Sequence, residues 1–160
     1  MYDQANGHPK QGKWPFTAAD ESLPGCDGYR FKNVAPNAAR SFYEYFLAQG
    51  KRGGMVAFEP DFMQQNYQCV REYIEELNAM PTWLAGLEAA ALSFTPPIPI
   101  QFCMATPMQL LHSMRMPAVT NFRASNDYYY GGSYKIGTSS LLIWAVGQAP
   151  SKDTFVSTLT

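Results

Sequence analysis

The sequence predicts an α/β fold built from parallel βα units, and three observations support this prediction. Short apolar runs typical of buried strands alternate along the chain with segments of helical periodicity. The connections between them are short, as in right-handed crossovers that return the chain to one sheet. The 160 residues are 46% hydrophobic and 16% charged, a composition that can form a packed core.

The N-terminal part of the chain differs in amino-acid composition from the rest. Residues 1–36 are polar and rich in Gly, Pro, Asn and Asp, which predicts an irregular arm with little regular structure. The composition changes at Pro36, and we expect the α/β domain to extend over residues 37–160.

The first element of this domain is predicted to be a helix. Phe42, Tyr45 and Phe46 recur at intervals of three and four, which places them on one helical face. The helix is expected to start near Asn37 and to end either at Gly50 or at the pair Gly53-Gly54.

Three apolar runs predict strands. The first covers residues 55–58, and its pairing is expected to stop at Pro60, which has no N–H to donate. The second and third cover residues 98–104 and 117–125, and residues 154–158 are a candidate for a fourth.

Helices are predicted between and after these strands. Residues 66–79 form one helix with Ile74 and Leu77 on its apolar face, and Pro81 starts the next. One or two helical turns are expected over residues 108–114.

The last predicted helix covers residues 138–147, with Thr138 or Ser139 as its N-terminal cap. It carries Trp144 beside two leucines. We therefore expect this tryptophan in the core, with a sugar-stacking role as the alternative.

Charge and cysteine usage exclude several classes of function. A net charge of −1 argues against nucleic acid as a partner, and the apolar runs are too short to predict a membrane span. The chain has three cysteines, Cys26, Cys69 and Cys103, which is an odd number. They are widely spaced and form no CxxC motif. We expect buried reduced thiols, with no metal and no other cofactor.

Polar side chains follow each predicted strand at its carboxyl end, where parallel α/β folds gather their active sites. They are Glu59 and Asp61 after the first strand, Cys103 and Met104 after the second, and Arg123, Ser125 and Asp127 after the third. Carboxylates facing each other across one pocket would suit glycoside hydrolysis. The alternative is that these acidic residues only cap the helices that follow.

The run from Gln101 to Gly132, followed by residues 134–158, resembles a stretch of retaining glycosidase barrels of the α-galactosidase and raffinose-synthase type. The matching elements are Cys103-Met104, the motif RASNDY at residues 123–128, and an Asp-x-Phe element that begins at Asp153. The resemblance extends from Gly53 to Thr158, about two thirds of the 160 residues.

This resemblance implies the middle to late strands of a (β/α)8 barrel and assigns roles to individual residues. Asp127 matches the acid/base aspartate of the family. Arg123 would orient the groups of the site or adjust their charge. The nucleophile in the family usually lies in a Lys-x-Asp setting, which this chain lacks. Both Asp61, favoured by residue type, and Glu59, favoured by strand register, remain candidates. The substrate-binding candidates besides Arg123 are Ser125, Tyr128 and Asp153.

The length conflicts with a complete barrel, which needs eight strands and about 250 residues. Two interpretations follow. In the first, the chain is a retaining glycosidase acting on a carbohydrate substrate, and other chains or the rest of a longer polypeptide complete the sheet. In the second, it is a non-catalytic, glycosidase-like fragment that serves as a structural or interaction subunit of a larger assembly.

Overall fold

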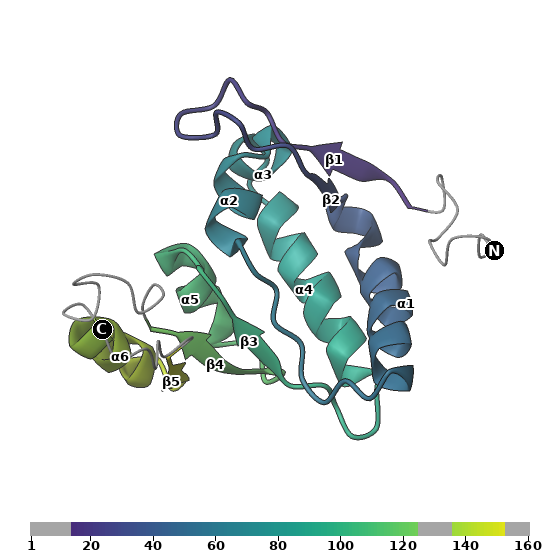
Figure 1. Cartoon of the computed structure of the whole chain (residues 1–160), viewed down its shortest axis with the longest axis vertical. Coiled ribbons are helices and arrows are strands. Elements are labelled where there is room, and N and C mark those ends of the chain that lie inside the picture. Colours follow the sequence, from purple (N-terminus) through teal and green to yellow (C-terminus); the bar gives the residue numbers. More distant parts are fainter. Residues whose placement is uncertain (1–13, 125–135, 153–160) are drawn as a thin grey trace, which may run out of the picture.

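The computed structural model describes residues 14–124 and 136–152 and shows a mixed arrangement of helices and strands (Figure 1). The elements are β1 (Phe16–Ala18), β2 (Lys32–Val34), the 3-10 helix η1 (Pro36–Ala38), α1 (Ala39–Arg52), α2 (Met63–Gln68), α3 (Arg71–Glu75), α4 (Ala79–Leu92), β3 (Ile100–Phe102), α5 (Pro107–Ser113), β4 (Val119–Arg123), α6 (Ile136–Ala145) and β5 (Ala149–Ser151). Four predicted elements, the helix starting near Asn37, the helical turns at 108–114 and the strands within 98–104 and 117–125, are confirmed as α1, α5, β3 and β4.

The main sheet is parallel, with strand order β3-β4-β5, and confirms the α/β class. The first predicted strand is reduced to a short segment beside β3, where Phe58 forms an isolated parallel bridge with Ile100. The bridge at Phe58 is the last one of this segment, in agreement with the predicted end of pairing at Pro60. The Pro60 carbonyl accepts from the Cys103 amide at 3.3 Å, because proline lacks only the donor. A partial barrel is not shown by these strands.

One face of this sheet is packed against helices. Phe58 contacts two rings of α1, Tyr43 at 6.0 Å and Phe46 at 5.5 Å between centroids. Phe102 and Phe122 lie 5.0 Å apart on the same sheet face. Since side chains alternate between faces, the residues next to these phenylalanines point to the opposite face, which the polar site described below occupies.

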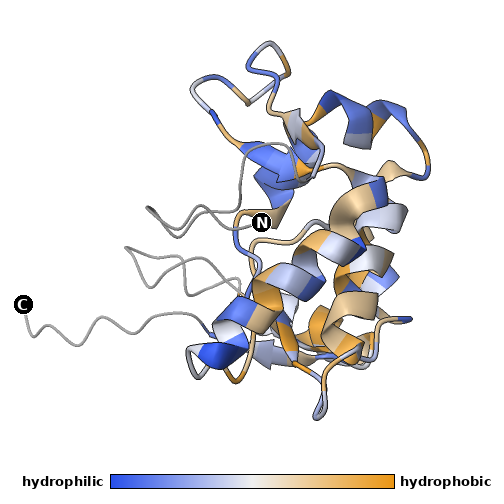
Figure 2. Ribbon diagram, turned by 90° about the vertical axis from the view of Figure 1, so that its right-hand side faces the viewer, coloured by the Kyte–Doolittle hydropathy of each residue, from blue (hydrophilic) through white to orange (hydrophobic). Residues whose placement is uncertain are grey.

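Helix α4 is the centre of the core. It buries seven residues, Ala79, Met80, Trp83, Leu84, Leu87, Ala90 and Ala91, and packs along α1. The helices approach closely at Gly86, where a Cβ would lie 2.8 Å from the Cβ of Ala39. Hydrophobic residues gather in the α1–α4 and sheet region, whereas the end of the molecule that carries β1 and β2 is more hydrophilic (Figure 2).

The N-terminal arm is more ordered than predicted. β1 and β2 pair antiparallel, and a disulfide joins Cys26 to Cys69 across 43 residues of sequence. The prediction of reduced thiols is therefore wrong for these two cysteines and holds only for Cys103, which is free and buried. Arg71 adds an ion pair to Asp20 at 2.8 Å. The hairpin is thus fastened to the α2–α3 region.

The helix predicted over residues 66–79 is two short helices. The break falls after Cys69, where Val70 is extended, and the Cys69 carbonyl accepts from the Asp20 amide at 2.8 Å instead of continuing a helix. Ile74 and Leu77, predicted to face the core, are 42% and 90% exposed. Tertiary attachment of the hairpin overrides the local periodicity here.

The last helix also differs from its prediction. α6 already includes Ile136, so Thr138 and Ser139 lie inside the helix and do not cap it. The prediction that Trp144 lies in the core is wrong, because its side chain is 72% exposed. Among the described residues, no helix combines the length and apolarity needed to cross a membrane.

Candidate functional site

Three neighbouring strand ends bring polar side chains together around Cys103. Arg123 donates from Nη1 to the Cys103 Sγ at 3.0 Å. The carboxylates of Asp61 and Glu59 also lie near the thiol, close enough to raise its pKa. Four residues that were singled out in the sequence therefore meet at the carboxyl edge of the parallel sheet, as expected for an α/β site.

Cys103 is the most deeply buried residue of this cluster. Its side chain is fully buried, whereas Glu59 and Asp61 are exposed and Arg123 is half-buried. Burial, with the Asp61 and Glu59 carboxylates, raises the pKa of the Cys103 thiol to about 12, although Arg123 acts in the opposite direction. The group is thus a protonated thiol at neutral pH and a poor nucleophile. The carboxylates above it are the groups able to reach a ligand.

A row of amide and carboxylate side chains continues from this cluster across the sheet. Gln101 donates from Nε2 to Glu59 Oε2 at 3.0 Å, and Asn121 donates from Nδ2 to Gln101 Oε1 at 2.6 Å. The parallel register pairs Gln101 with Asn121, which places both on the same face as Arg123. We call Glu59, Gln101 and Asn121 the polar row.

Gln101 and Asn121, the two amide residues of the polar row, escaped the sequence-based prediction, although a signal for them exists. Gln101 and Cys103 alternate with Phe102, and Asn121 and Arg123 alternate with Phe122. Strict alternation indicates a strand with one polar face, whereas parallel strands covered on both faces read as continuous apolar runs.

The loop that carries Asp61 is held in a specific backbone conformation. Asp61 Oδ1 accepts from the Phe62 amide at 2.7 Å, and its carbonyl accepts from Asn66 Nδ2 at 3.0 Å. Phe62 has φ +53° and Met104, at the next strand end, has φ +52°. Non-glycine residues in this left-handed region are uncommon and cluster at functional sites.

The two strand-end loops are tied directly to each other. The Gln64 amide donates to the Met104 carbonyl at 2.8 Å, so the first turn of α2 finds acceptors in the loop after β3. Buried Gln109 adds a second link, donating from Nε2 to the Met63 carbonyl and accepting from the Thr106 amide. The Asp61 loop and the Cys103 loop therefore form one connected unit.

Four predicted site residues lie outside the described residues, namely Ser125, Asp127, Tyr128 and Asp153. Within residues 14–124 and 136–152, no group of three or more His, Cys, Asp or Glu side chains is arranged to hold a metal ion. No protein-family model, curated protein or solved structure matches this chain.

Proposed function

We propose that the chain is a glycoside hydrolase-like protein that performs retaining hydrolysis or transfer of glycosides. The observation that carries this proposal is the meeting of Glu59 and Asp61 with Arg123 at the carboxyl edge of a parallel sheet. Two exposed carboxylates beside a cation and a row of amides can hydrogen-bond sugar hydroxyls and stabilise developing positive charge. The resemblance of residues 101–132 to retaining glycosidases points to the same chemistry.

In this mechanism a carboxylate oxygen attacks the anomeric carbon while the glycosidic bond to the leaving oxygen breaks. Asp127 donates its proton to that leaving oxygen, then takes a proton from water as water releases the sugar. Asp61 is the favoured nucleophile and Glu59 the alternative. Arg123 would orient the substrate, with Ser125, Tyr128 and Asp153 as further contacts. The chemistry requires neither a metal nor an organic cofactor.

The test is turnover of a panel of aryl α- and β-glycosides by the wild type and by single variants. Asp127→Asn and Asp61→Asn should each lower kcat by a factor of about 10² to 10⁴, because each removes a group that acts in the transition state. Asp27→Asn, at an exposed position in the hairpin, is the matched control and should leave turnover unchanged.

Variants and product stereochemistry decide between the candidates. If Glu59→Gln loses activity and Asp61→Asn does not, Glu59 is the nucleophile. A product of inverted configuration would exclude the covalent mechanism. Full activity of Asp127→Asn, or no turnover of any glycoside by the wild type, would refute the enzymatic proposal.

The second candidate is a non-catalytic subunit that acts through its surface. The exposed apolar residues of α6 favour it, because such residues normally find a partner. Other chains, or the rest of a longer polypeptide, would then complete the sheet. The native mass distinguishes the two: a chain that occurs only with partners favours this candidate, whereas a chain above about 30 kDa favours the enzyme, because a barrel then has enough residues to close.

A further inference from the structure

Helix α2 connects the N-terminal hairpin to the loop that carries Asp61 (Figure 1). The hairpin holds the end of this helix, because the disulfide joins Cys26 to Cys69 and the Asp20 amide donates to the Cys69 carbonyl at 2.8 Å. The two cysteines are only 1% and 2% exposed. The hairpin is therefore a covalently fixed support for the last turn of α2.

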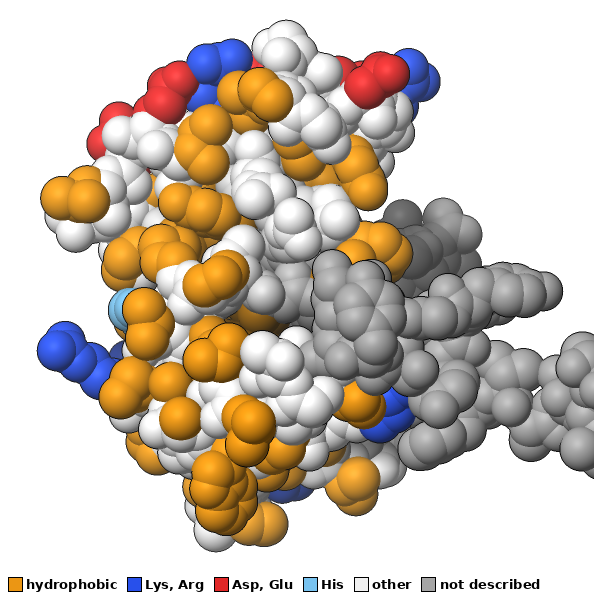
Figure 3. Space-filling model, turned by 90° about the vertical axis from the view of Figure 1, so that its left-hand side faces the viewer, with side chains coloured by type: hydrophobic (Ala, Val, Ile, Leu, Met, Phe, Trp, Pro, Cys, Tyr) orange, Lys and Arg blue, Asp and Glu red, His pale blue; other side chains and the backbone are white. Residues whose placement is uncertain are grey.

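Ion pairs add little to this attachment. Charged side chains of both signs lie at the end of the molecule that carries the hairpin (Figure 3). Arg71 pairs there with Asp20 at 2.8 Å and with Glu75 at 2.7 Å. The three side chains are between 30% and 56% exposed, and exposed ion pairs contribute little to stability. The attachment thus depends mainly on the disulfide and on hydrogen bonds.

Asn66 is the residue at which the hairpin and the Asp61 loop meet. Its carbonyl accepts from Nδ2 of Asn33 in β2 at 3.2 Å. Its own Nδ2 donates to the Asp61 carbonyl at 3.0 Å, and its amide donates to the Phe62 carbonyl at 2.8 Å. This half-buried residue therefore bonds to the hairpin on one side and to two residues of the loop on the other.

The residue type suits this connection better than it suits a helix. Asparagine is a poor helix former, because its side chain competes for nearby backbone groups. Helix α2 has only six residues, too few to be stable by itself, and the Asn66 side chain reaches back five positions to Asp61. The bond spans Phe62, whose φ of +53° is unfavourable for a residue with a Cβ. The left-handed turn at Phe62 therefore depends on such contacts.

The two candidate nucleophiles are held in different ways. The backbone of Asp61 is bonded to Asn66 in α2. The side chain of Glu59 accepts from Gln101 on the neighbouring strand at 3.0 Å. The position of Asp61 therefore depends on α2 and the hairpin, whereas that of Glu59 depends on the sheet.

We propose that Asn66 is a positioning residue, which transmits the placement of the disulfide-bonded hairpin to the Asp61 loop and so sets the position of the Asp61 carboxylate. Asp61 Oδ1 accepts from the Phe62 amide at 2.7 Å, so a rotation of the backbone at Phe62 moves the carboxylate as well. The kinetic consequence rests on the proposed function with Asp61 as nucleophile, whereas the link between hairpin and loop does not. Displacing a reacting group by about 1 Å lowers a rate by up to about 10²-fold.

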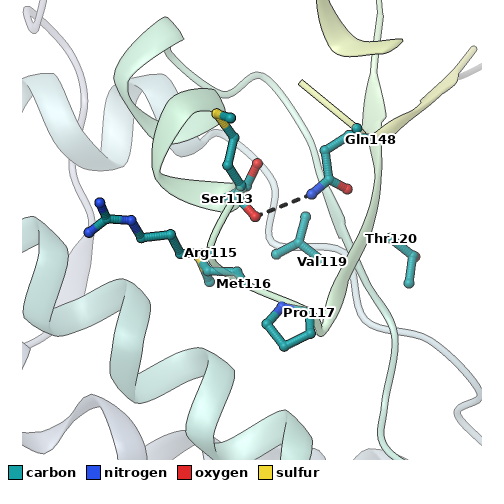
Figure 4. Close-up of a pocket in the computed structure, with 9 residues that line it drawn as sticks. Ser113, Arg115, Met116, Pro117, Val119, Thr120 and Gln148 are labelled. Carbon is teal, nitrogen blue, oxygen red and sulfur yellow. Dashed lines mark hydrogen bonds between the residues drawn. The ribbon is translucent and has the colours of Figure 1, made fainter. Parts of the chain in front are cut away.

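A matched control lies at the opposite edge of the sheet. There Gln148 donates from Nε2 to the Ser113 carbonyl at 3.2 Å, in a groove at the amino ends of β4 and β5 (Figure 4). This bond joins a side-chain amide to a backbone carbonyl, as the bond from Asn66 to Asp61 does, and Gln148 is 8% exposed. Gln148→Ala therefore removes the same kind of contact at a site remote from the Asp61 loop.

Hydrogen exchange followed by nuclear magnetic resonance tests the link without a substrate. In Asn66→Ala, the amides of residues 62–66 should exchange about five- to tenfold faster, the effect expected for the loss of one hydrogen bond. Asn33→Ala should act in the same direction, because it removes the bond from the hairpin to the Asn66 carbonyl. Gln148→Ala should leave these rates unchanged, because opening of the Asp61 loop does not break its bond.

Turnover of the aryl glycosides tests the kinetic consequence, with rates compared per folded protein at a temperature where circular dichroism shows each variant folded. Asn66→Ala and Asn33→Ala should lower kcat by a factor of about 10 to 10². Their KM should stay within about twofold of the wild-type value, because the groups that bind the sugar remain in place. Gln148→Ala should change neither constant.

The outcomes separate this proposal from the enzymatic one. Wild-type exchange rates at residues 62–66 in Asn66→Ala would overturn it. So would faster exchange with an unchanged kcat in a chain that turns over glycosides, because Asn66 would then only stabilise α2. A wild type without turnover refutes the enzymatic proposal, while the exchange rates still decide whether the hairpin and the loop are linked. If Asn66→Ala does not fold, Asn33→Ala, which leaves the sequence of α2 intact, answers the same questions.

Discussion

Gly86 provides the sharpest test of the packing that supports the site. It lies in the middle of α4, where this helix crosses α1. A Cβ added there would lie 2.7 Å from the Arg40 amide nitrogen and 2.8 Å from the Ala39 Cβ. Both contacts are with rigid parts of α1, so neither can be relieved by rotating a side chain.

Two effects of opposite sign decide the result of Gly86→Ala. Alanine improves helix propensity over glycine by about 0.8–1 kcal/mol. Restoring an ordinary separation of about 3.5 Å from Ala39 would require α1 to move by about 0.7 Å, and such overpacking costs about 1–3 kcal/mol. We expect a net loss of about 0.5–2 kcal/mol, which lowers the Tm by about 2–6 °C in a chain of this size.

Thermal unfolding followed by circular dichroism measures this effect. Gly137→Ala is the matched control, since no atom lies within 4 Å of its Cβ position in α6. That variant should melt at the wild-type temperature or slightly above it, because propensity alone then acts. A Gly86→Ala protein as stable as the wild type would refute the close approach of α1 and α4.

Three further outcomes are expected. Loss of the Cys26–Cys69 disulfide, by reduction or by replacing both residues with serine, should lower the free energy of unfolding by about 3–4 kcal/mol. The reason is that the bond closes a loop with a sequence separation of 43. Thermal unfolding with and without reductant measures this loss. The free energy of unfolding should fall between pH 9 and pH 12, because the Cys103 thiol loses its proton in the unfolded chain over this range but keeps it in the folded chain. Denaturant titrations at several pH values measure this fall, which should be shallower for Cys103→Ala. Gln101→Glu would place a second carboxylate against Glu59, so this variant should be less stable than the wild type at pH 7. Its stability should return toward the wild-type value below about pH 5, where the carboxylates take up protons. A stability difference that does not change with pH would contradict the contact between Gln101 and Glu59.

The helices and strands with strong local signals were predictable from the sequence. The aromatic spacing at Phe42, Tyr45 and Phe46 predicts α1, and the apolar runs within residues 98–104 and 117–125 predict β3 and β4. The position of polar residues at strand ends also identified Glu59, after the run 55–58, and Arg123, near the end of the run 117–125, as site candidates. A parallel arrangement then brings them together without further information.

Features that depend on distant partners were not predictable. The bond between Cys26 and Cys69 joins residues 43 apart, and cysteine spacing cannot specify such a pairing. The same attachment breaks the helical periodicity at Val70 and leaves Leu77 exposed. Trp144 has the neighbours of a core residue in sequence, but nothing in periodicity states which side of an apolar helix meets the sheet.

The sequence by itself determined the α/β class, the order of most elements and the polar character of the strand ends, since these follow from local alternation and spacing. The tertiary structure alone decided which side chains touch Cys103, how Gln101 joins Glu59 to Asn121, and which face of α6 is left uncovered. The physical reason is that register and packing are set by contacts between residues far apart in the chain. A one-residue change of register would reverse the face of every strand side chain without altering the local pattern.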